Sequence, residues 1–287
     1  MSVKPIREHT GKALLQKWLP EYSGGKHSMK CAGVLVTPSV LKKGGGFFSW
    51  GKSKDTESQG ESWDDILEAN PWLKTEKLVA KPDQLIKRRG KAGLIAANKS
   101  FDEAKQWVMD RMCKDQTIET VTGQLTHFLI EPFVPHKQEQ EHYVCIQSHR
   151  YVDEIYFYHE GGVDVGDVDA KAEKMNIKVG EAITKEQVTS VLLKKMPAAR
   201  KDNMADFLVA LFNYYKDLNF AYLEINPLVM LDDNTVVPLD MAAKIDETAD
   251  FLCAQKWGPI DWPPPFGRAA YPEEALIREM DGKTGAS

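Results

Sequence analysis

The amino-acid sequence predicts an α/β or α+β protein built from two lobes, and three observations support this prediction. Its 287 residues correspond to roughly two domains at about 150 residues per domain. Short apolar segments typical of strands alternate with segments of helical periodicity along the chain, without an internal repeat. Finally, Pro132 and Pro135 break a central apolar run, which favours a hinge between the lobes near residue 132.

Composition and charge exclude several classes of protein. Hydrophobic residues make up 43% and charged residues 28% of the chain, which is typical of globular proteins. The net charge of −5 provides no overall positive field for nucleic acid or an anionic membrane. No apolar run approaches the ~18 residues of a membrane-spanning helix, and the N-terminus lacks the apolar segment of a secretory signal. We therefore expect neither nucleic acid nor membrane as a partner.

Cysteine usage favours a reducing compartment. The sequence has four widely separated cysteines and no Cys-x-x-Cys pair: Cys31, Cys113, Cys145 and Cys253. This spacing predicts reduced thiols and argues against a disulfide framework or a zinc site. We therefore expect a cytosolic protein.

The first lobe is expected to comprise residues 1–135. Thr10 is the expected N-cap of an apolar-faced helix that extends past Leu19. Ser100 and Glu103 have the spacing of a capping box at the start of a second helix. Strands are expected at 32–36, 77–81, 92–97 and 128–134.

Residues 42–62 differ from the rest of this lobe. They are rich in glycine, serine and charge without any apolar period, which predicts a flexible surface insertion. Within them, Gly46 to Ser53 match the phosphate-binding pattern G-x-x-x-x-G-K-[ST]. Such a loop needs a packed helix directly after it, and the following residues have no apolar stripe. We therefore interpret this match as fortuitous.

A basic stretch interrupts the otherwise acidic chain. Lys81 and the residues from Lys87 to Lys91 supply five cations around Gly90. Arginine forks and lysine charges are the groups that neutralise a polyphosphate, and glycine allows its backbone to approach a ligand closely. A solvated basic turn is the alternative interpretation.

The second lobe is expected to span residues 136–265. Strands are expected at 143–147 and 154–158, Thr184 and Gln187 form a second capping box, and an apolar stripe over 204–215 predicts a buried helix. Residues 266–287 are expected to form a linker toward a further region.

A hairpin is expected to join residues 221–226 to 236–241. A two-residue loop at Asp233-Asn234 would pair residues whose numbers sum to 467. Asn226 and Asp240 sum to 466, so an amide and a carboxylate are expected to lie together. Such hard oxygen ligands suit Mg²⁺, which completes its shell with phosphates and water. Alternatively, the two residues lie at the ends of strands and bind no metal.

Five stretches, taken together and in order, resemble the ATP-grasp region of the ATP-citrate lyase (ATP-citrate synthase) family, which is related to the β subunits of succinyl-CoA ligases. They begin Leu78-Val-Ala-Lys-Pro, Phe128-Leu-Ile-Glu-Pro, His159-Glu-Gly-Gly, Tyr222-Leu-Glu-Ile-Asn-Pro and Pro263-Pro-Pro-Phe-Gly-Arg. The resemblance covers nearly the whole chain except the insertion at 42–62. It implies a two-lobed ATP-grasp fold.

The resemblance also implies roles for individual residues. The ATP phosphates would be contacted by Lys81, Arg89 and Gly90. Adenine would be held by backbone groups of Pro132 and Val134, and the ribose by Glu141. The metal ligands implied by the family are Asn226 and Asp240, with a further set at Asp281, Thr284 and Ala286. No catalytic residue is expected in this chain, since the histidine that accepts phosphate lies beyond it in the family.

The implied activity is that of a MgATP-binding module within a larger enzyme. The whole enzyme would use ATP, CoA and citrate to form acetyl-CoA and oxaloacetate through a phosphohistidine and citryl phosphate. Its partners would be the nucleotide and the rest of the polypeptide or another subunit, in an oligomer. Two alternatives stay open from the sequence: a succinyl-CoA ligase β subunit, and a non-catalytic nucleotide-binding fragment.

Overall fold

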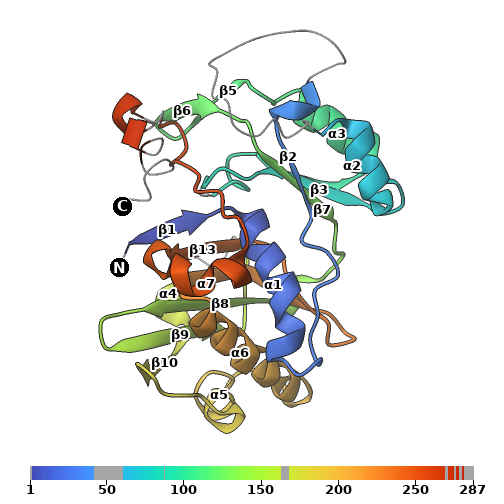
Figure 1. The fold of residues 1–287 in the computed structure, drawn as a ribbon. Helices are drawn as coiled ribbons and strands as arrows, with labels where there is room; N and C mark the ends of the chain where they lie inside the picture. Colours follow the sequence, from blue (N-terminus) through green and yellow to red (C-terminus); the bar gives the residue numbers. More distant parts are fainter. Residues whose placement is uncertain are drawn as a thin grey trace.

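Two β-sheets lie one above the other in the computed structural model (Figure 1). The structure describes residues 2–41, 61–86, 88–162, 168–268, 271–274, 276–277 and 280, with only the backbone at 168–169. The matched pattern at Gly46–Ser53 and all but the last two residues of the 42–62 insertion therefore lie outside the described residues. Within the described part of the chain, no helix is both long and apolar enough to cross a membrane.

The larger sheet has the strand order β1-β13-β11-β8-β9-β10, with β12 paired to β11. Its described pairings are antiparallel. The strands are β1 (Val3–Ile6), β8 (Glu141–Ser148), β9 (Val152–Tyr158), β10 (Glu173–Lys178), β11 (Phe220–Met230), β12 (Val236–Pro238) and β13 (Met241–Asp246).

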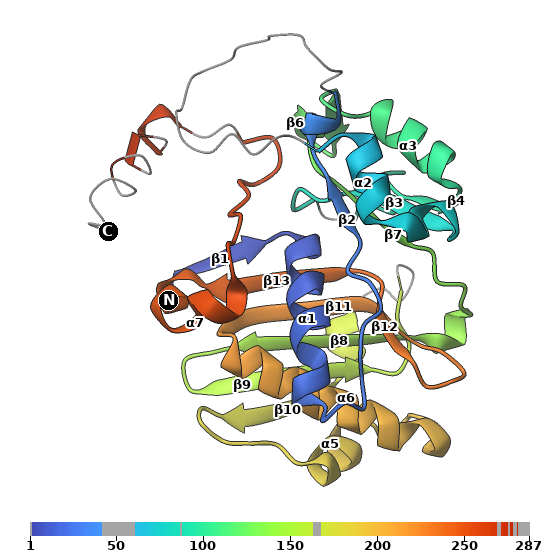
Figure 2. The same cartoon turned by 45° about the vertical axis from the view of Figure 1, so that its right-hand side comes forward.

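Helices cover one face of the larger sheet (Figure 2). The predicted apolar stripe at 204–215 belongs to α6 (Ala198–Asp217), whose Phe207, Leu211 and Phe212 are fully buried. Together with the sheet they form the main hydrophobic core. The other helices on this side are α1 (Glu8–Tyr22), α5 (Lys185–Val191) and α7 (Asp250–Trp257), and α4 (Val168–Lys171) contacts β9.

The smaller sheet has the order β2-β7-β3-β4 and its own apolar core. It consists of β2 (Val34–Val36), β3 (Leu78–Pro82), β4 (Ala96–Lys99) and β7 (Phe128–Pro132). Helices α2 (Trp63–Ala69) and α3 (Phe101–Met109) pack against it, and β5 (Asp115–Ile118) and β6 (Val121–Gln124) form a separate hairpin. Short 3-10 turns lie at Pro38–Leu41, Pro71–Lys74, Gln138–Gln140 and Glu247–Ala249.

Local sequence signals located several of these elements correctly. The capping boxes at Ser100 and Thr184 are present, with each hydroxyl accepting a backbone N–H three residues later. The strand expected at 92–97 is displaced and forms at Ala96–Lys99, because residues 88–93 form turns that are closed by bonds such as Leu94 N–H to the Arg89 carbonyl.

The expected N-cap at Thr10 is wrong, because the N-cap of α1 is Arg7, three residues earlier. The Asp83 carboxylate accepts the N–H groups of Glu8 at 2.8 Å and His9 at 3.0 Å. A side chain 75 residues distant in the sequence therefore satisfies amides that an N-cap residue ordinarily serves.

The predicted register of the hairpin is wrong by one residue. Its loop has three residues, 232–234, because Leu231 N–H bonds to the Thr235 carbonyl and Asn234 adopts a left-handed φ of 66°. The observed pairs sum to 466, as Val229 opposite Val237 shows. The longer loop places Asn226 opposite Asp240, and Asn226 N–H donates to the Asp240 carbonyl at 3.1 Å.

The N-terminal residues lie with the larger sheet although they precede the smaller one in the sequence. Strand β1 pairs with β13, and α1 packs on the main core. The residues expected to form the first lobe, 1–135, are thus divided between the two sheets, and the domain boundaries stay a prediction.

The segment after α7 crosses from one sheet to the other (Figure 2). Trp262 packs on the core of the larger sheet, and Phe266 packs on that of the smaller sheet. Gly267 lies against Gly123, where an added Cβ on Gly123 would be 2.7 Å from the Gly267 Cα. Glycine is required at this crossing of two backbones.

Candidate functional site

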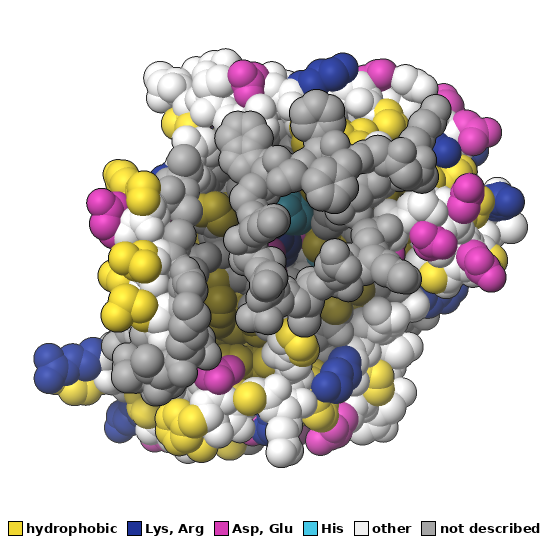
Figure 3. Space-filling view, turned by 45° about the horizontal axis from the view of Figure 1, so that its top comes forward, with side chains coloured by type: hydrophobic (Ala, Val, Ile, Leu, Met, Phe, Trp, Pro, Cys, Tyr) yellow, Lys and Arg dark blue, Asp and Glu magenta, His cyan; other side chains and the backbone are white. Residues whose placement is uncertain are grey.

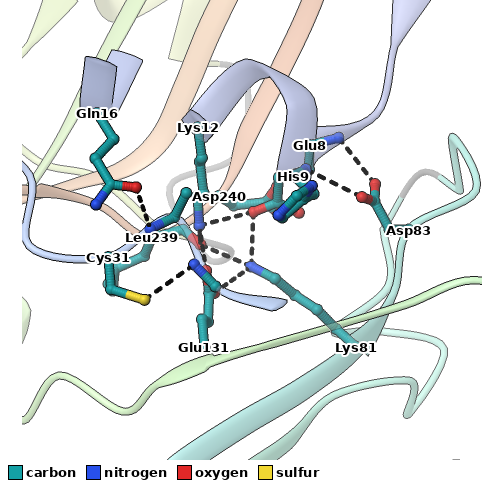
Figure 4. Close-up of polar contacts among 12 residues, drawn as sticks. Glu8, His9, Lys12, Gln16, Cys31, Lys81, Asp83, Glu131, Leu239 and Asp240 are labelled. Atoms are coloured by element: carbon teal, nitrogen blue, oxygen red, sulfur yellow. Dashed lines mark hydrogen bonds and ion pairs between the residues drawn. The ribbon is translucent and has the colours of Figure 1, made fainter. Parts of the chain in front are cut away.

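Charged residues from four segments, distant from one another in the sequence, meet between the two sheets. The segments are the first turns of α1, the strands β3 and β7 with the turn after β3, and the junction between β12 and β13. We call their side chains the ion-pair cluster, which consists of Glu8, Lys12, Lys81, Arg89, Glu131 and Asp240. Figure 4 shows how Glu8, Lys12, Lys81 and Glu131 point toward one another.

The two lysines of the cluster share the same partners. Lys81 Nζ lies 2.7 Å from Glu8 Oε1, from Glu131 Oε1 and from the Leu239 carbonyl. Lys12 Nζ reaches Glu8 Oε1 at 2.9 Å, Glu131 Oε2 at 2.6 Å and the same carbonyl at 2.9 Å. Each lysine thus donates two hydrogen bonds, one to a carboxylate and one to the Leu239 carbonyl, and forms an ion pair with a second carboxylate.

Both lysines are also inaccessible, with Lys12 0% and Lys81 2% exposed. Burial opposes a charged lysine, yet the neighbouring carboxylates of Glu131 and Glu8 raise the pKa of Lys81 above its usual range. Lys81 is therefore a permanent buried cation, tied to α1 and to the carbonyl before Asp240.

Glu8 is the carboxylate that joins all three cations. It contacts both lysines through Oε1 and Arg89 Nη2 through Oε2 at 2.5 Å. Burial alone would raise the pKa of Glu8, but the charges of Arg89 and the lysines hold it well below the usual range. Glu8 is thus ionised in the folded protein.

Arg89 links this buried part of the cluster to its accessible edge. Its Nη1 donates to the Pro82 carbonyl at 2.7 Å, and its Nη2 contacts Glu8 and, at 2.6 Å, Asp240 Oδ1. The Arg89 side chain is 8% exposed, whereas the Asp240 side chain is 40% exposed. Gly90, next to Arg89, lies exposed in the same turn.

Figure 3 shows a hollow in the molecular surface with a histidine and lysine or arginine atoms visible at its floor. Cationic side chains thus lie below the surface on this face of the molecule. A polyanion entering such a hollow would meet positive charge in a poorly solvated environment, where electrostatic attraction is strong.

A second group of predicted residues lies along the start of β8. His136 Nε2 lies 2.9 Å from Glu141 Oε1, and its Nδ1 lies 2.7 Å from the Val134 carbonyl. Gln138 Nε2 donates to Glu141 Oε2 at 3.0 Å and to the Gly161 carbonyl. The structure therefore brings Val134 and Glu141 together through His136, directly after Pro132 at the end of β7.

The two glycines after Glu160 are required by close packing against this group. A Cβ on Gly161 would lie 2.4 Å from the His142 carbonyl oxygen, and a Cβ on Gly162 would lie 2.2 Å from Glu141 Oε2. Gly162 also has a φ of +98° and donates its N–H to Asn226 Oδ1 at 2.9 Å. These contacts connect the β8 group to the hairpin.

The predicted metal ligands on the hairpin are neighbours. Asn226 and Asp240 are joined by a backbone hydrogen bond, and they offer one amide oxygen and one carboxylate. The described residues contain no cluster of three or more His, Cys, Asp or Glu side chains able to hold a metal. Two oxygens suit Mg²⁺ bound together with a phosphate ligand, so the pair fits this ion. Asp281, Thr284 and Ala286 lie outside the described residues.

Sequence reasoning singled out Lys81, Arg89 and Asp240 of this cluster but missed Glu8, Glu131 and Lys12. Glu8 and Lys12 stand four residues apart on α1, a spacing that indicates a helical ion pair. Glu131 was visible as a charged residue inside a buried-strand pattern. The spacing of Glu8 and Lys12 predicts only their pairing with each other, and the strand pattern predicts only that Glu131 is buried. Neither signal identifies the partners that come from other segments.

Comparisons with known proteins find similar sequences over the whole chain. The model of the family described as the ATP-citrate synthase ATP-grasp domain matches residues 2–257. ATP-citrate synthase of Bos taurus is 49% identical over the whole chain, which covers 24% of that protein. The probable ATP-citrate synthase subunit 2 of Schizosaccharomyces pombe is 40% identical, and the chain covers 66% of it.

A solved structure also matches this chain. The structure of ATP citrate lyase from Methanothrix soehngenii in complex with citrate and coenzyme A superposes with a TM-score of 0.80 at 35% identity. The match covers 99% of this chain and 61% of that one. The chain thus spans about a quarter of the length of the mammalian relatives it matches.

Proposed function

The chain belongs to the ATP-citrate synthase ATP-grasp domain family, and from this premise we propose that it binds MgATP between its two sheets as the nucleotide-binding module of an ATP-citrate lyase. The observation that carries the proposal is the arrangement of buried cations directly beside an oxygen-ligand pair on a hairpin. Family membership favours this function over that of a succinyl-CoA ligase β subunit.

We assign the phosphate-binding role to the basic part of the site. The guanidinium N–H donors of Arg89 lie near Asp240 at the accessible edge of the ion-pair cluster, and Gly90 is exposed in the same turn. Lys81 donates hydrogen bonds to Glu8 and the Leu239 carbonyl and forms an ion pair with Glu131, so its contribution to phosphate binding is its charge, unless it exchanges one of those contacts for a phosphate oxygen. Catalysis by such a module consists of positioning and charge neutralisation.

Adenine and ribose are assigned to the group at the start of β8. Backbone groups of Pro132 and Val134 would hold the base, and Glu141 would accept hydrogen bonds from the ribose hydroxyls. The bonds from His136 and Gln138 hold the Glu141 carboxylate in one orientation, which favours a binding role for it.

Asn226 and Asp240 would hold the magnesium ion. When bound, Mg²⁺ neutralises phosphate oxygens and helps to orient the γ-phosphoryl group. The bond from Gly162 N–H to Asn226 Oδ1 fixes the amide, whose carbonyl retains a second lone pair. The second set, Asp281, Thr284 and Ala286, is proposed from the family resemblance alone.

The complete reaction would require the rest of the enzyme. A histidine outside this chain would accept the phosphoryl group, and citrate and CoA would bind beyond the linker proposed at residues 266–287. We propose acetyl-CoA and oxaloacetate as products and an oligomeric enzyme with this chain as one part. We also propose two lobes at 1–135 and 136–265, with β1 and α1 of the first packed on the sheet of the second. The four cysteines, all among the described residues, form no disulfide with one another, which supports a cytosolic location.

Calorimetric titration of the folded chain tests the proposal. ATP with Mg²⁺ is expected to bind, and Asp240→Ala is expected to abolish the part of the affinity that depends on Mg²⁺ while leaving the circular dichroism spectrum unchanged. Asp233→Ala, in the exposed loop of the same hairpin, serves as the control. A folded wild-type chain that binds no ATP with Mg²⁺ would contradict the proposed function.

A further inference from the structure

The accessible edge of the ion-pair cluster has an unusual composition. Five of its six side chains are at most 11% exposed, and the sixth, Asp240, is 40% exposed. A ligand from solvent therefore reaches the cluster first at an acidic residue, although the cations lie behind it. A carboxylate in this position repels a nucleotide that arrives without a metal.

Asp240 and Arg89 have unequal roles in their ion pair. Arg89 keeps its bonds to Glu8 and to the Pro82 carbonyl whether or not Asp240 contacts it. Its guanidinium thus stays in place when the pair opens. The Asp240 side chain is free to turn toward another cation, since the described ion pair of its carboxylate is the one to Arg89.

The same carboxylate is the proposed metal ligand, so it has two competing cations. A divalent ion that binds Asp240 takes it from Arg89 and frees guanidinium N–H groups for a phosphate oxygen. A metal-free polyphosphate must instead displace Asp240 from Arg89 and leave an unpaired carboxylate beside its own negative charge.

We propose that the Arg89–Asp240 ion pair makes this site selective for the metal complex of a nucleoside triphosphate over the metal-free nucleotide. The inference rests on the proposed function, because it assumes that the phosphates bind at Arg89. It assigns Asp240 a second role: in the absence of metal it occupies Arg89 and weakens the binding of free polyphosphate.

Asp240→Asn tests this role because it removes the charge and keeps the shape. ATP affinity is measured by calorimetry in EDTA and in excess Mg²⁺, for the wild type and the variant. The variant is expected to bind metal-free ATP about five- to tenfold more tightly than the wild type, as loss of a partly exposed ion pair and a like charge predicts. Its gain in affinity on adding Mg²⁺ is expected to shrink.

Asp232→Asn is a matched control on the same hairpin. Asp232 pairs with Arg200 Nη2 at 2.9 Å and is 75% exposed, so this variant makes the same change in net charge at the other end of the hairpin. It is expected to leave both affinities unchanged. An equal gain in metal-free affinity for both variants would overturn the proposal, because it would reflect net charge alone.

Two further outcomes separate the inference from the function it rests on. If the wild type binds MgATP but Asp240→Asn leaves metal-free affinity unchanged or weaker, the selectivity role is wrong and the nucleotide site stands. If the folded wild type binds ATP in neither condition, the proposed function itself fails. Thermal unfolding of each variant verifies that the measured chains are folded.

Discussion

The apolar core of the larger sheet and the ion-pair cluster are both buried, but they are built in opposite ways. The core combines α6 with strands whose side chains alternate between the two faces, so each element contributes a recognisable local pattern. The cluster draws single residues from positions 8, 12, 81, 89, 131 and 240. Burial in the core is favourable by itself, whereas buried charges are tolerated only when they are paired.

This difference shows where the fold is constrained for function. Three carboxylates and three cations balance in the cluster, and removing one member leaves others uncompensated in a poorly solvated environment. An apolar cluster of similar volume could join the two sheets without that risk. The retained charges are therefore explained best by a requirement for cations at this place, as the phosphate-binding proposal demands.

The largest expected effect is the loss of the carboxylate at the centre of the cluster. Glu8→Ala leaves Lys12, Lys81 and Arg89 with one buried and one partly exposed carboxylate, and we expect a destabilisation of about 3–5 kcal/mol. Urea unfolding measures it. Glu21→Ala, at an exposed position of the same helix, is the control and should change stability by less than about 0.5 kcal/mol. An equally small change for Glu8→Ala would show that the cluster contributes little to holding the sheets together.

A somewhat smaller effect is expected in the apolar core. Leu211 is 0% exposed on α6, and Leu211→Ala should destabilise the chain by about 2–5 kcal/mol through lost burial and a cavity. Asn213→Ala, exposed on the same helix, is the control. The folded Leu211→Ala variant should bind MgATP with unchanged affinity in calorimetry, because Leu211 lies in the apolar core and not in the ion-pair cluster. A change in affinity would mean that the core and the site are coupled.

The same contrast explains how much could be predicted from the sequence. The stripe on α6 and the capping boxes at Ser100 and Thr184 depend on residues three or four apart, and all were predicted correctly. The start of α1 was not, because its N-terminal amides bind the distant Asp83. Local patterns identify elements, but they do not contain contacts between segments.

The site was predicted in the same partial way. Lys81 and Arg89 were singled out from the basic stretch and Asp240 from the hairpin, the resemblance implied their roles, and the structure brings the three into one cluster. The pairing of Asn226 with Asp240 was nearly correct, with an error of one residue that came from the length of the loop. Glu8 was not singled out, since two of its three partners, Lys81 and Arg89, lie more than 70 residues away in the sequence. Their ligand-binding roles stay a prediction.

The smallest expected effect is a dependence of stability on pH that separates the two regions. In the core, His27 packs edge-on against Phe207, and burial lowers its pKa from the usual 6.5. The unfolded chain binds this proton more readily, so the contribution of neutral His27 is lost as pH falls below about 6.5. In the cluster, burial opposes ionisation, but the cations hold the pKa of Glu8 well below the usual 4.5. Its contribution is therefore complete above pH 4.5 and is lost below it. Urea unfolding between pH 7 and pH 3 should therefore show two windows. His27→Gln should reduce the pH dependence in the upper one, to which other buried histidines such as His142 also contribute, and Glu8→Gln should reduce it in the lower one. If Glu8→Gln instead flattened the upper window, the cluster would titrate through a group other than the Glu8 carboxylate.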